Sequence, residues 1–402
     1  MPVCPNMVSI RLAQDEMHHL LEEQGNVGVR CCLQATTATT TGSQVAFDYL
    51  NKGAANVIFK IRPELNSSAK RFQFVDVSPK DKLSGVAIPV AHQNLMGTVL
   101  RVPRGGQKHL SSLEILDGFE HAIRPLFLPG TRTKTQLDRD LTKHLMDHEG
   151  VLLFPDVMNH LYTRVEKLTF ANTQSRRKCW GILLPDMSPT PGQSIMIEVK
   201  PKWLAQSPNA PPKAIRCRTC AMHVSVPKKR DNYVCPLQLL HGNSASLQPW
   251  SQTTVMRQFD GTASPSPVVV SGIAKALLDY VTVGDGIILL QHLLNLQSSL
   301  DPCGVLCRPQ ADSGTFDHNL RLAMTLRDCS LFIKITYNTA GVTVIESKLG
   351  DLDFKSAEKI VDWMDKEKQL LRDGSYTVSA KQSPICWLQR VQGVSDIVQV
   401  WK

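Results

Sequence analysis

The stretch DCSLFIKITYNTAGVTVIESKLGD, residues 328–351, decides the fold of the second half of this chain. Leu331 to Tyr337 and Gly341 to Ser347 are both rich in residues that favour β-strands. The tetrapeptide between them, Asn338-Thr339-Ala340-Gly341, is typical of a turn. The stretch therefore predicts an antiparallel hairpin.

Asp328 and Asp351 lie equally far from the centre of this turn. If the strands pair without a bulge, both carboxylates lie at the open end of the hairpin, where paired Cα atoms are about 4.5–5.5 Å apart. Two carboxylates so close repel unless a cation lies between them or one is protonated. A magnesium ion that bridges ATP phosphates is the usual occupant of such a site. The alternative is that both acids are solvated residues flanking a hairpin.

The segment after Asp351 has helical periodicity over residues 353–364. Its apolar stripe consists of Phe354, Ala357, Val361 and Met364. Lys355 and Lys359 share a different face with Trp363. A lysine pair directly after a metal-binding aspartate suits a substrate with many phosphates, whereas the simpler explanation is an exposed charged face.

A short strand at Ser194 to Val199 runs into the motif Glu198-Val199-Lys200-Pro201-Lys202. Pro201 stops the strand and directs the chain toward Lys202. Two lysines held at a rigid strand end can bind two phosphates, although a basic strand terminus is the simpler explanation.

The whole chain has the pattern of an α+β protein with two lobes. The Pro- and Gly-rich segment LLPDMSPTPGQ, residues 183–193, predicts a boundary that divides the chain into an N-lobe of residues 1–185 and a C-lobe of residues 186–402. The strands expected in the first lobe are Ala55 to Ile61, Val86 to Val90 and Gly97 to Val102. The expected helices are Asp15 to Gln24, Leu110 to Ala122, Thr135 to Asp147, Gly272 to Val281 and Gly286 to Leu300.

The composition limits the possible functions but does not identify one. Of 402 residues, 45 are basic and 36 acidic, so the net charge of +9 favours an anionic partner: nucleic acid, membrane headgroups or phosphorylated metabolites. The longest apolar stretch, Ile287 to Leu296, is too short and too polar to span a bilayer. The N-terminus has no signal-peptide pattern, so the eleven cysteines are expected to be thiols or metal ligands.

Four soft ligands lie close together in one basic loop. Cys217-x-x-Cys220-x-x-His223, followed by Cys235, could surround a tetrahedral zinc ion, with His241 as a competitor for the fourth place. Unligated thiols are the alternative.

Five motifs occur in order over about residues 50–365. They are GAANV (53–57), GTVLRVPR (97–104), EVKPK (198–202), RDCSLFI (327–333) and DLDFK (351–355). In these motifs the chain resembles the inositol-pentakisphosphate 2-kinase family and is similar to a fungal member of it. The resemblance implies a two-lobed inositol-phosphate kinase fold related to protein kinases, with ATP between the lobes. It also implies transfer of the ATP γ-phosphoryl to the 2-hydroxyl of inositol 1,3,4,5,6-pentakisphosphate, which gives inositol hexakisphosphate (phytate).

The resemblance also implies roles for individual residues. Asp328 would be the catalytic aspartate and Asp351 the Mg²⁺ ligand. The nucleotide would contact Gly53, Asn56, Arg101, Asp186 near the adenine and Glu198 near the ribose. The substrate phosphates would contact Lys200, Lys202, Lys355, Lys359 and an N-lobe arginine, Arg177 or its neighbour Arg176.

Rival functions stay open at this point. A basic, zinc-containing nucleic-acid-binding protein would need neither aspartate, but with only 6% aromatic residues the chain offers few stacking platforms for bases. A non-catalytic scaffold that binds inositol phosphates, or a kinase for another inositol phosphate, would use the same motifs. As a kinase, the protein is expected to be a monomer in the nucleus or cytoplasm that binds a small-molecule substrate, with no membrane or nucleic-acid partner.

Overall fold

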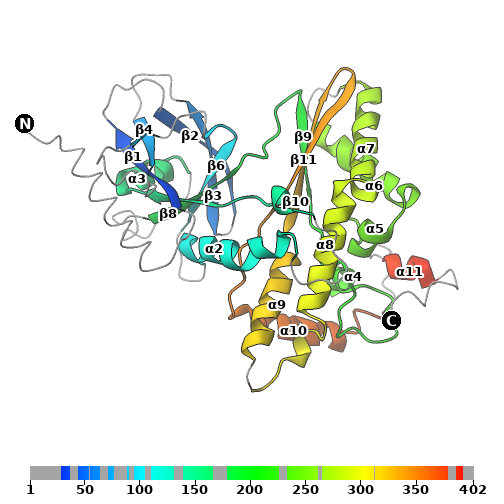
Figure 1. Cartoon of the computed structure of the whole chain (residues 1–402). Helices are drawn as coiled ribbons and strands as arrows, with labels where there is room; N and C mark the ends of the chain where they lie inside the picture. Colours follow the sequence, from blue (N-terminus) through cyan, green and yellow to red (C-terminus); the bar gives the residue numbers. More distant parts are fainter. Residues whose placement is uncertain are drawn as a thin grey trace, which may run out of the picture. The chain divides into compact units, whose positions relative to one another are not determined.

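A computed structural model describes residues 29–36, 44–53, 55–63, 71–76, 88–89, 95–104, 110–130, 139–165, 179–225, 233–260, 265–311, 313–378 and 386–392. The chain forms two compact units (Figure 1). Unit 1 contains residues 1–121 and 146–186, and unit 2 contains residues 122–145 and 187–402. The main boundary thus follows Asp186, and the segment Ala122–Leu145 belongs to the second unit.

Unit 1 is built on an eight-stranded sheet in the order β1-β7-β8-β6-β3-β2-β4-β5. An additional antiparallel pairing of β1 with β4 closes the sheet on itself. The strands are β1 (Val29–Thr36), β2 (Gln44–Lys52), β3 (Asn56–Pro63), β4 (Arg71–Asp76), β5 (Ile88–Pro89), β6 (Thr98–Pro103), β7 (Glu149–Leu153) and β8 (Cys179–Pro185). Helix α3 (Pro155–Thr163) packs on β1, and its Val157, Met158 and Leu161 join a core that includes Phe47, Phe59, Phe72 and Phe74.

Two of the three expected strands of this unit are confirmed, as β3 and β6. Residues 86–90 yield only the two-residue β5 within the described chain. Helix α2 (Ser112–Gly118) starts at a capping box in which Ser111 and Glu114 each bond the backbone of the other. It is shorter than predicted, because a single π-helical turn, Phe119–Ile123, follows it.

Two other helix predictions have different outcomes. The helix at Thr135 to Asp147 is wrong for its described part, residues 139–147, which contains one 3₁₀ turn, Thr142–His144. Leu145 instead forms a bridge with Leu349 of unit 2. The helix at Asp15 to Gln24 lies outside the described residues.

Unit 2 contains a three-stranded antiparallel sheet in the order β11-β10-β9. Its strands are β9 (Ser194–Val199), β10 (Ser330–Asn338) and β11 (Gly341–Gly350), so the predicted hairpin and the strand before it are confirmed. Leu331, Ile333 and Ile335 alternate along β10 and are fully buried. Figure 1 shows α7 beside this sheet, and α7 contacts both β10 and β11.

The hairpin contains a β-bulge, so the condition under which Asp328 and Asp351 would lie opposite each other is not met. Thr336 pairs with Val344, but Tyr337 pairs with Val342, so one extra residue lies in β11 near the turn. The last pair at the open end is therefore Ser330 with Gly350. Asp328 and Asp351 both lie just beyond this pair but are not directly opposite each other.

Eight α-helices belong to the described part of unit 2. They are α4 (Arg218–Ser225), α5 (Pro236–His241), α6 (Ser244–Met256), α7 (Pro267–Thr282), α8 (Asp285–Leu300), α9 (Gly314–Leu326), α10 (Lys359–Arg372) and α11 (Trp387–Gln392). The two leucine-rich helices expected at 272–281 and 286–300 are confirmed as α7 and α8. No helix in the described ranges has the length and apolarity needed to cross a membrane.

The helix predicted over residues 353–364 starts later, at Lys359. Lys355 is held outside it, because its N–H donates to Thr325 Oγ1 (3.1 Å) and its carbonyl accepts from Arg321 Nε (2.6 Å). The predicted apolar stripe is also wrong: Val361 is 64% exposed, whereas Trp363 is buried. Residues 353–358 continue the helical periodicity of the sequence, but Lys355 bonds to α9 and the helix begins only after it.

Candidate active site

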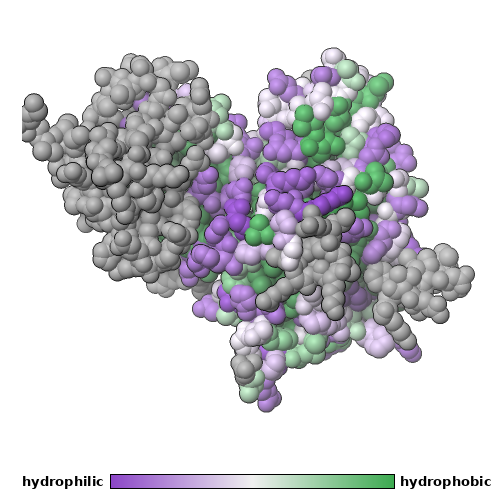
Figure 2. Space-filling view, in the orientation of Figure 1, coloured by the Kyte–Doolittle hydropathy of each residue, from purple (hydrophilic) through white to green (hydrophobic). Residues whose placement is uncertain are grey.

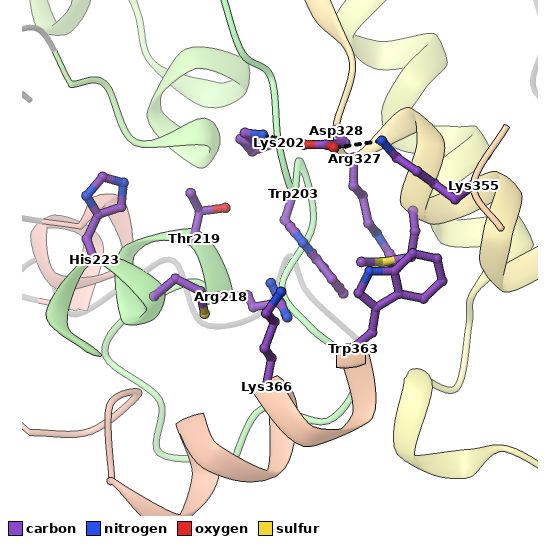
Figure 3. Close-up of a pocket in the computed structure, with 12 residues that line it drawn as sticks. Lys202, Trp203, Arg218, Thr219, His223, Arg327, Asp328, Lys355, Trp363 and Lys366 are labelled. Carbon is purple, nitrogen blue, oxygen red and sulfur yellow. Dashed lines mark hydrogen bonds and ion pairs between the residues drawn. The ribbon is translucent and has the colours of Figure 1, made fainter. Parts of the chain in front are cut away.

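A carboxylate held by two ammonium groups is the centre of the candidate site. Asp328 lies between α9 and β10, and its backbone N–H donates to Thr325 O (3.1 Å). Lys202 Nζ donates to Oδ1 and Lys355 Nζ donates to Oδ2, both at 2.8 Å. Figure 3 shows the two lysines approaching Asp328 from opposite sides. The sequence motifs EVKPK and DLDFK therefore converge on the RDCS motif.

The lysines keep Asp328 ionised. Partial burial raises the pKa of this carboxyl, but the positive charges and hydrogen bonds of Lys355 and Lys202 outweigh that effect and lower the pKa to about 2. At neutral pH Asp328 is thus an anion that can accept a hydrogen bond from a hydroxyl group.

A second polar chain lies beside it. Lys200 Nζ donates to Ser330 Oγ (2.7 Å), and Ser330 Oγ donates to Glu198 Oε1 (2.7 Å). Burial raises the pKa of Glu198, but the bond from Ser330 and the charges of the neighbouring lysines lower it overall. Lys200 Nζ also lies 3.7 Å from Asp351 Oδ2, so one lysine links Glu198 to the acid after β11.

Two non-glycine residues of the site have left-handed backbones. Lys202 has φ 55° and Asp351 has φ 58°. Such conformations cost side-chain-bearing residues free energy and persist where surrounding contacts fix them. Both turns follow the end of a strand, and they place Lys202 against Asp328 and leave the Asp351 side chain 51% exposed.

A pocket of about 440 Å³ opens next to Asp328 (Figure 3). Its basic lining residues are Lys202, Arg218, Arg327, Lys355 and Lys366, with His223 at α4. Figure 2 shows hydrophilic side chains over much of the face of unit 2 that it presents. The pocket is therefore suited to a polyanion.

The outcomes for the remaining predicted substrate residues differ. Lys359 is exposed at the first position of α10 and does not line this pocket. Arg177 lies outside the described residues. Lys366, two turns further along α10, does line the pocket, and sequence reasoning missed it. The sequence feature that could have identified Lys366 is its spacing: it follows Trp363 by three residues, so both lie on the same side of the helix.

The predicted nucleotide residues Asn56 and Arg101 meet within unit 1. In the amide orientation that satisfies both groups, the Asn56 side-chain oxygen accepts from Arg101 Nη2 (2.7 Å) and Nε (3.1 Å). Arg101 belongs to β6 and is 9% exposed. Gly53, in the β2–β3 connection, donates its N–H to Asn56 O (2.9 Å). Asp186, directly after β8, forms an ion pair with Lys60 (3.3 Å).

Four cysteines form a separate buried cluster. The Sγ atoms of Cys217, Cys220, Cys235 and Cys386 all lie within 4.8 Å of one another. The fourth member is thus Cys386, and the prediction of His223 in this place is wrong. The His223 ring instead packs on Tyr233, with 4.2 Å between ring centroids, and lines the pocket. Cys386 gave no spacing signal, because it is 151 residues beyond Cys235.

Two comparisons relate these features to known proteins. The sequence model of the inositol-pentakisphosphate 2-kinase family matches residues 49–369. A protein of Yarrowia lipolytica named inositol-pentakisphosphate 2-kinase is 27% identical over 262 residues, which is 60% of this chain and 80% of that protein. The family match includes all five motifs and ends within α10.

Proposed function

The chain belongs to the inositol-pentakisphosphate 2-kinase family, and on this premise we propose how its residues transfer the γ-phosphoryl of ATP to the 2-hydroxyl of inositol 1,3,4,5,6-pentakisphosphate. The product is inositol hexakisphosphate. The observation that carries the proposal is the Asp328 carboxylate held between Lys202 and Lys355 at the edge of a basic pocket.

Asp328 orients the attacking hydroxyl. With a pKa of about 2 it is a weak base, so it positions the hydroxyl by accepting its hydrogen bond and takes the proton as the new P–O bond forms. This suits phosphoryl transfer, whose loose transition state needs positioning and charge neutralisation more than strong deprotonation. The bond from the γ-phosphorus to the bridging oxygen breaks, and ADP leaves.

Asp351 is suited to hold Mg²⁺. Its half-exposed carboxylate offers the hard oxygen ligands that this ion prefers. When bound, the ion neutralises charge on the ATP phosphates. Lys200, 3.7 Å from Asp351 and bonded to the Ser330–Glu198 pair, reduces the repulsion among the acids of the site.

The pocket cations hold the substrate. Five phosphates carry roughly −8 to −10 charges near neutral pH. Lys202, Lys355 and Lys366 offer their ammonium groups to the substrate phosphates. Arg218 and Arg327 also line the pocket, but the buried carboxylates of Glu367 and Asp301 compensate their charges. In unit 1, we assign Arg101 and Asn56 to the nucleotide phosphates, and Asp186 to the adenine.

A turnover assay with ATP, Mg²⁺ and inositol pentakisphosphate tests this mechanism. We expect hexakisphosphate from the wild type and a loss of at least about 100-fold in kcat for Asp328→Asn and for Asp351→Asn. Asp279→Asn, an exposed change on α7, is the matched control and keeps wild-type turnover. Normal turnover by Asp328→Asn would refute the proposed mechanism. A product other than inositol hexakisphosphate would show that the assigned substrate or position of phosphorylation is wrong.

We also propose that the four-cysteine cluster holds a structural Zn²⁺. A tetrahedral site with Zn–S bonds of about 2.3 Å has sulfur–sulfur distances of about 3.8 Å, and the Cys217–Cys235 and Cys235–Cys386 pairs are both 3.8 Å apart. Outer groups suit thiolates: the Tyr233 hydroxyl lies 3.1 Å from Cys220 Sγ, and the Cys217 N–H donates to Cys386 Sγ (3.2 Å).

Metal analysis of the purified protein tests the zinc site. About one equivalent is expected, with loss of metal and a lower Tm in Cys386→Ser. Cys303→Ser, at an exposed cysteine, is the control. Less than half an equivalent in the wild type would leave four unligated thiols as the explanation.

The resemblance to the family also suggests the fold relationship, oligomeric state and cellular location of the protein. We propose a fold related to protein kinases, with unit 1 as the nucleotide lobe, and a monomer that works in the nucleus or cytoplasm without nucleic acid as a ligand. Light scattering of the purified protein and imaging of a tagged protein test the oligomeric state and location. Salt-dependent RNA or DNA binding at physiological ionic strength would contradict the assignment of ligand.

A further inference from the structure

The indole ring of Trp203 lies between two guanidinium groups. Arg327 Cζ is 3.6 Å from the ring centroid and Arg218 Cζ is 4.4 Å from it. Figure 3 draws the ring between these two side chains, and all three residues line the pocket. Trp203 is only 5% exposed, so these cation–π contacts form where water cannot weaken them.

Each guanidinium is in turn fixed by a buried carboxylate. Arg327 Nη1 donates to Asp301 Oδ2 (2.5 Å), at the end of α8. Arg218 Nε donates to Glu367 Oε2 (2.7 Å), on α10. Both carboxylates are fully buried, so neither arginine can leave the ring without exposing an unpaired charge to a low dielectric. The ring is therefore held rigidly from both sides.

Two residues of this cluster, Trp203 and Arg327, are sequence neighbours of the Lys202–Asp328 ion pair. Trp203 directly follows Lys202, and Arg327 directly precedes Asp328. Gln297 of α8 fixes the same backbone: its Nε2 donates to Lys202 O (2.9 Å), and its Oε1 accepts from Leu204 N (3.0 Å). These contacts hold Lys202 in its left-handed conformation, with φ 55°.

We propose that Trp203 is a positioning residue, which through its stack with Arg327 and Arg218 sets the geometry of the Lys202–Asp328 pair for phosphoryl transfer. The inference rests on the proposed function and adds a residue to it. Although Trp203 lines the pocket, guanidinium groups lie against its ring, so the polyanionic substrate meets the lysines and not the indole faces. Trp203 acts mainly on the rate, because Lys202 is one of several cations that bind the substrate, whereas the Lys202–Asp328 pair orients the attacking hydroxyl.

Kinetics of Trp203→Leu and Trp203→Phe test the proposal. If the leucine variant displaces Lys202 and Asp328 by about 1 Å, its kcat should be about 100-fold lower. Its Kd for inositol pentakisphosphate should stay within about threefold of wild type. A threefold change is about 0.7 kcal/mol, which is too small for a lost contact with the substrate. The phenylalanine variant keeps a ring for the guanidiniums and recovers most of the rate. Trp250→Leu, at a half-buried tryptophan of α6, controls for the loss of an indole elsewhere in unit 2.

Three results would overturn the proposal. A matching rise in Kd means that the ring contacts the substrate. A rate loss that follows the drop in Tm, equally in the leucine and phenylalanine variants, means a structural role only. Unchanged kcat in Trp203→Leu means no role. If Trp203→Leu does not fold, Arg327→Lys replaces it. Lysine keeps a positive partner for the Asp301 carboxylate, but the planar stack on Trp203 is lost, so a similar loss in kcat with a much smaller change in Kd is expected.

A readout without turnover separates this inference from the proposed function. The NMR signal of the Lys202 ammonium group reports its hydrogen bond to Asp328, and it should broaden through faster hydrogen exchange in Trp203→Leu but not in Trp250→Leu. A wild type that does not phosphorylate inositol pentakisphosphate refutes the proposed function, whatever this signal does. An unaltered Lys202 signal in Trp203→Leu refutes the positioning role, whatever the substrate is.

Discussion

Replacing Glu367 with glutamine should cost unit 2 much of its stability. The Glu367 carboxylate is fully buried and accepts three bonds, from Ser207 Oγ (2.8 Å), Tyr376 Oη (2.6 Å) and Arg218 Nε (2.7 Å). Glutamine keeps the shape but removes the charge. The Ser207 and Tyr376 hydroxyls can rotate to suit an amide, but Arg218 can only donate, so the penalty falls on the arginine.

The size of the effect follows from burial. Arg218 is 7% exposed, and breaking a buried ion pair by removing one partner costs about 3–5 kcal/mol. For a domain of this size each kcal/mol lowers Tm by about 2–4 °C, so a decrease of about 6–20 °C is expected. Calorimetry or urea unfolding followed by circular dichroism measures it. Glu346→Gln, the same change at an exposed position of β11, should shift stability by less than about 0.5 kcal/mol.

A double variant identifies the cause. In Glu367→Leu with Arg218→Met both charges are gone, so part of the lost stability should return compared with Glu367→Leu alone. A Glu367→Gln protein within about 1 kcal/mol of wild type would refute the reasoning. A double variant less stable than the single one would show that packing, and not the uncompensated charge, dominates.

Three further predictions concern the nucleotide residues and titrating groups. Arg101→Met, which loses the guanidinium bonded to Asn56, should raise the KM for ATP about tenfold and leave the Kd of the inositol phosphate unchanged; an unaltered KM would exclude the assigned role. Lys355→Met should raise the pKa of Asp328 above about 2, because it removes the largest charge effect that lowers this pKa; an NMR titration of the carboxyl measures it. In the wild type the ionised group stabilises the fold above about pH 4, and this stability is lost only as pH falls toward 2. That contribution should be smaller in the variant. Burial lowers the pKa of His292 below its ordinary 6.5, so the folded state disfavours its proton and stability should fall as pH drops below 6.5; His292→Asn should flatten that dependence in unfolding curves, and an unchanged slope would contradict it.

Local patterns carried much of the fold. Strand β9 was predicted with its observed ends, and the β10–β11 hairpin with its turn, because alternation and turn residues act over a few neighbouring positions. The helices α7 and α8 followed from leucine periodicity in the same way. The five motifs likewise led to Asp328 and its two lysines, since short motifs keep their residues together in sequence.

What the sequence by itself determined was therefore the local elements and the types of residue available to the site. The tertiary structure alone decided which of them meet. Lys202 and Asp328 are 126 residues apart, Cys386 joins cysteines far upstream of it, and the start of α10 depends on bonds between Lys355 and α9. Periodicity has no information on such distant partners, because the hydrogen bonds, ion pairs and sulfur contacts that select them exist only after the chain has packed.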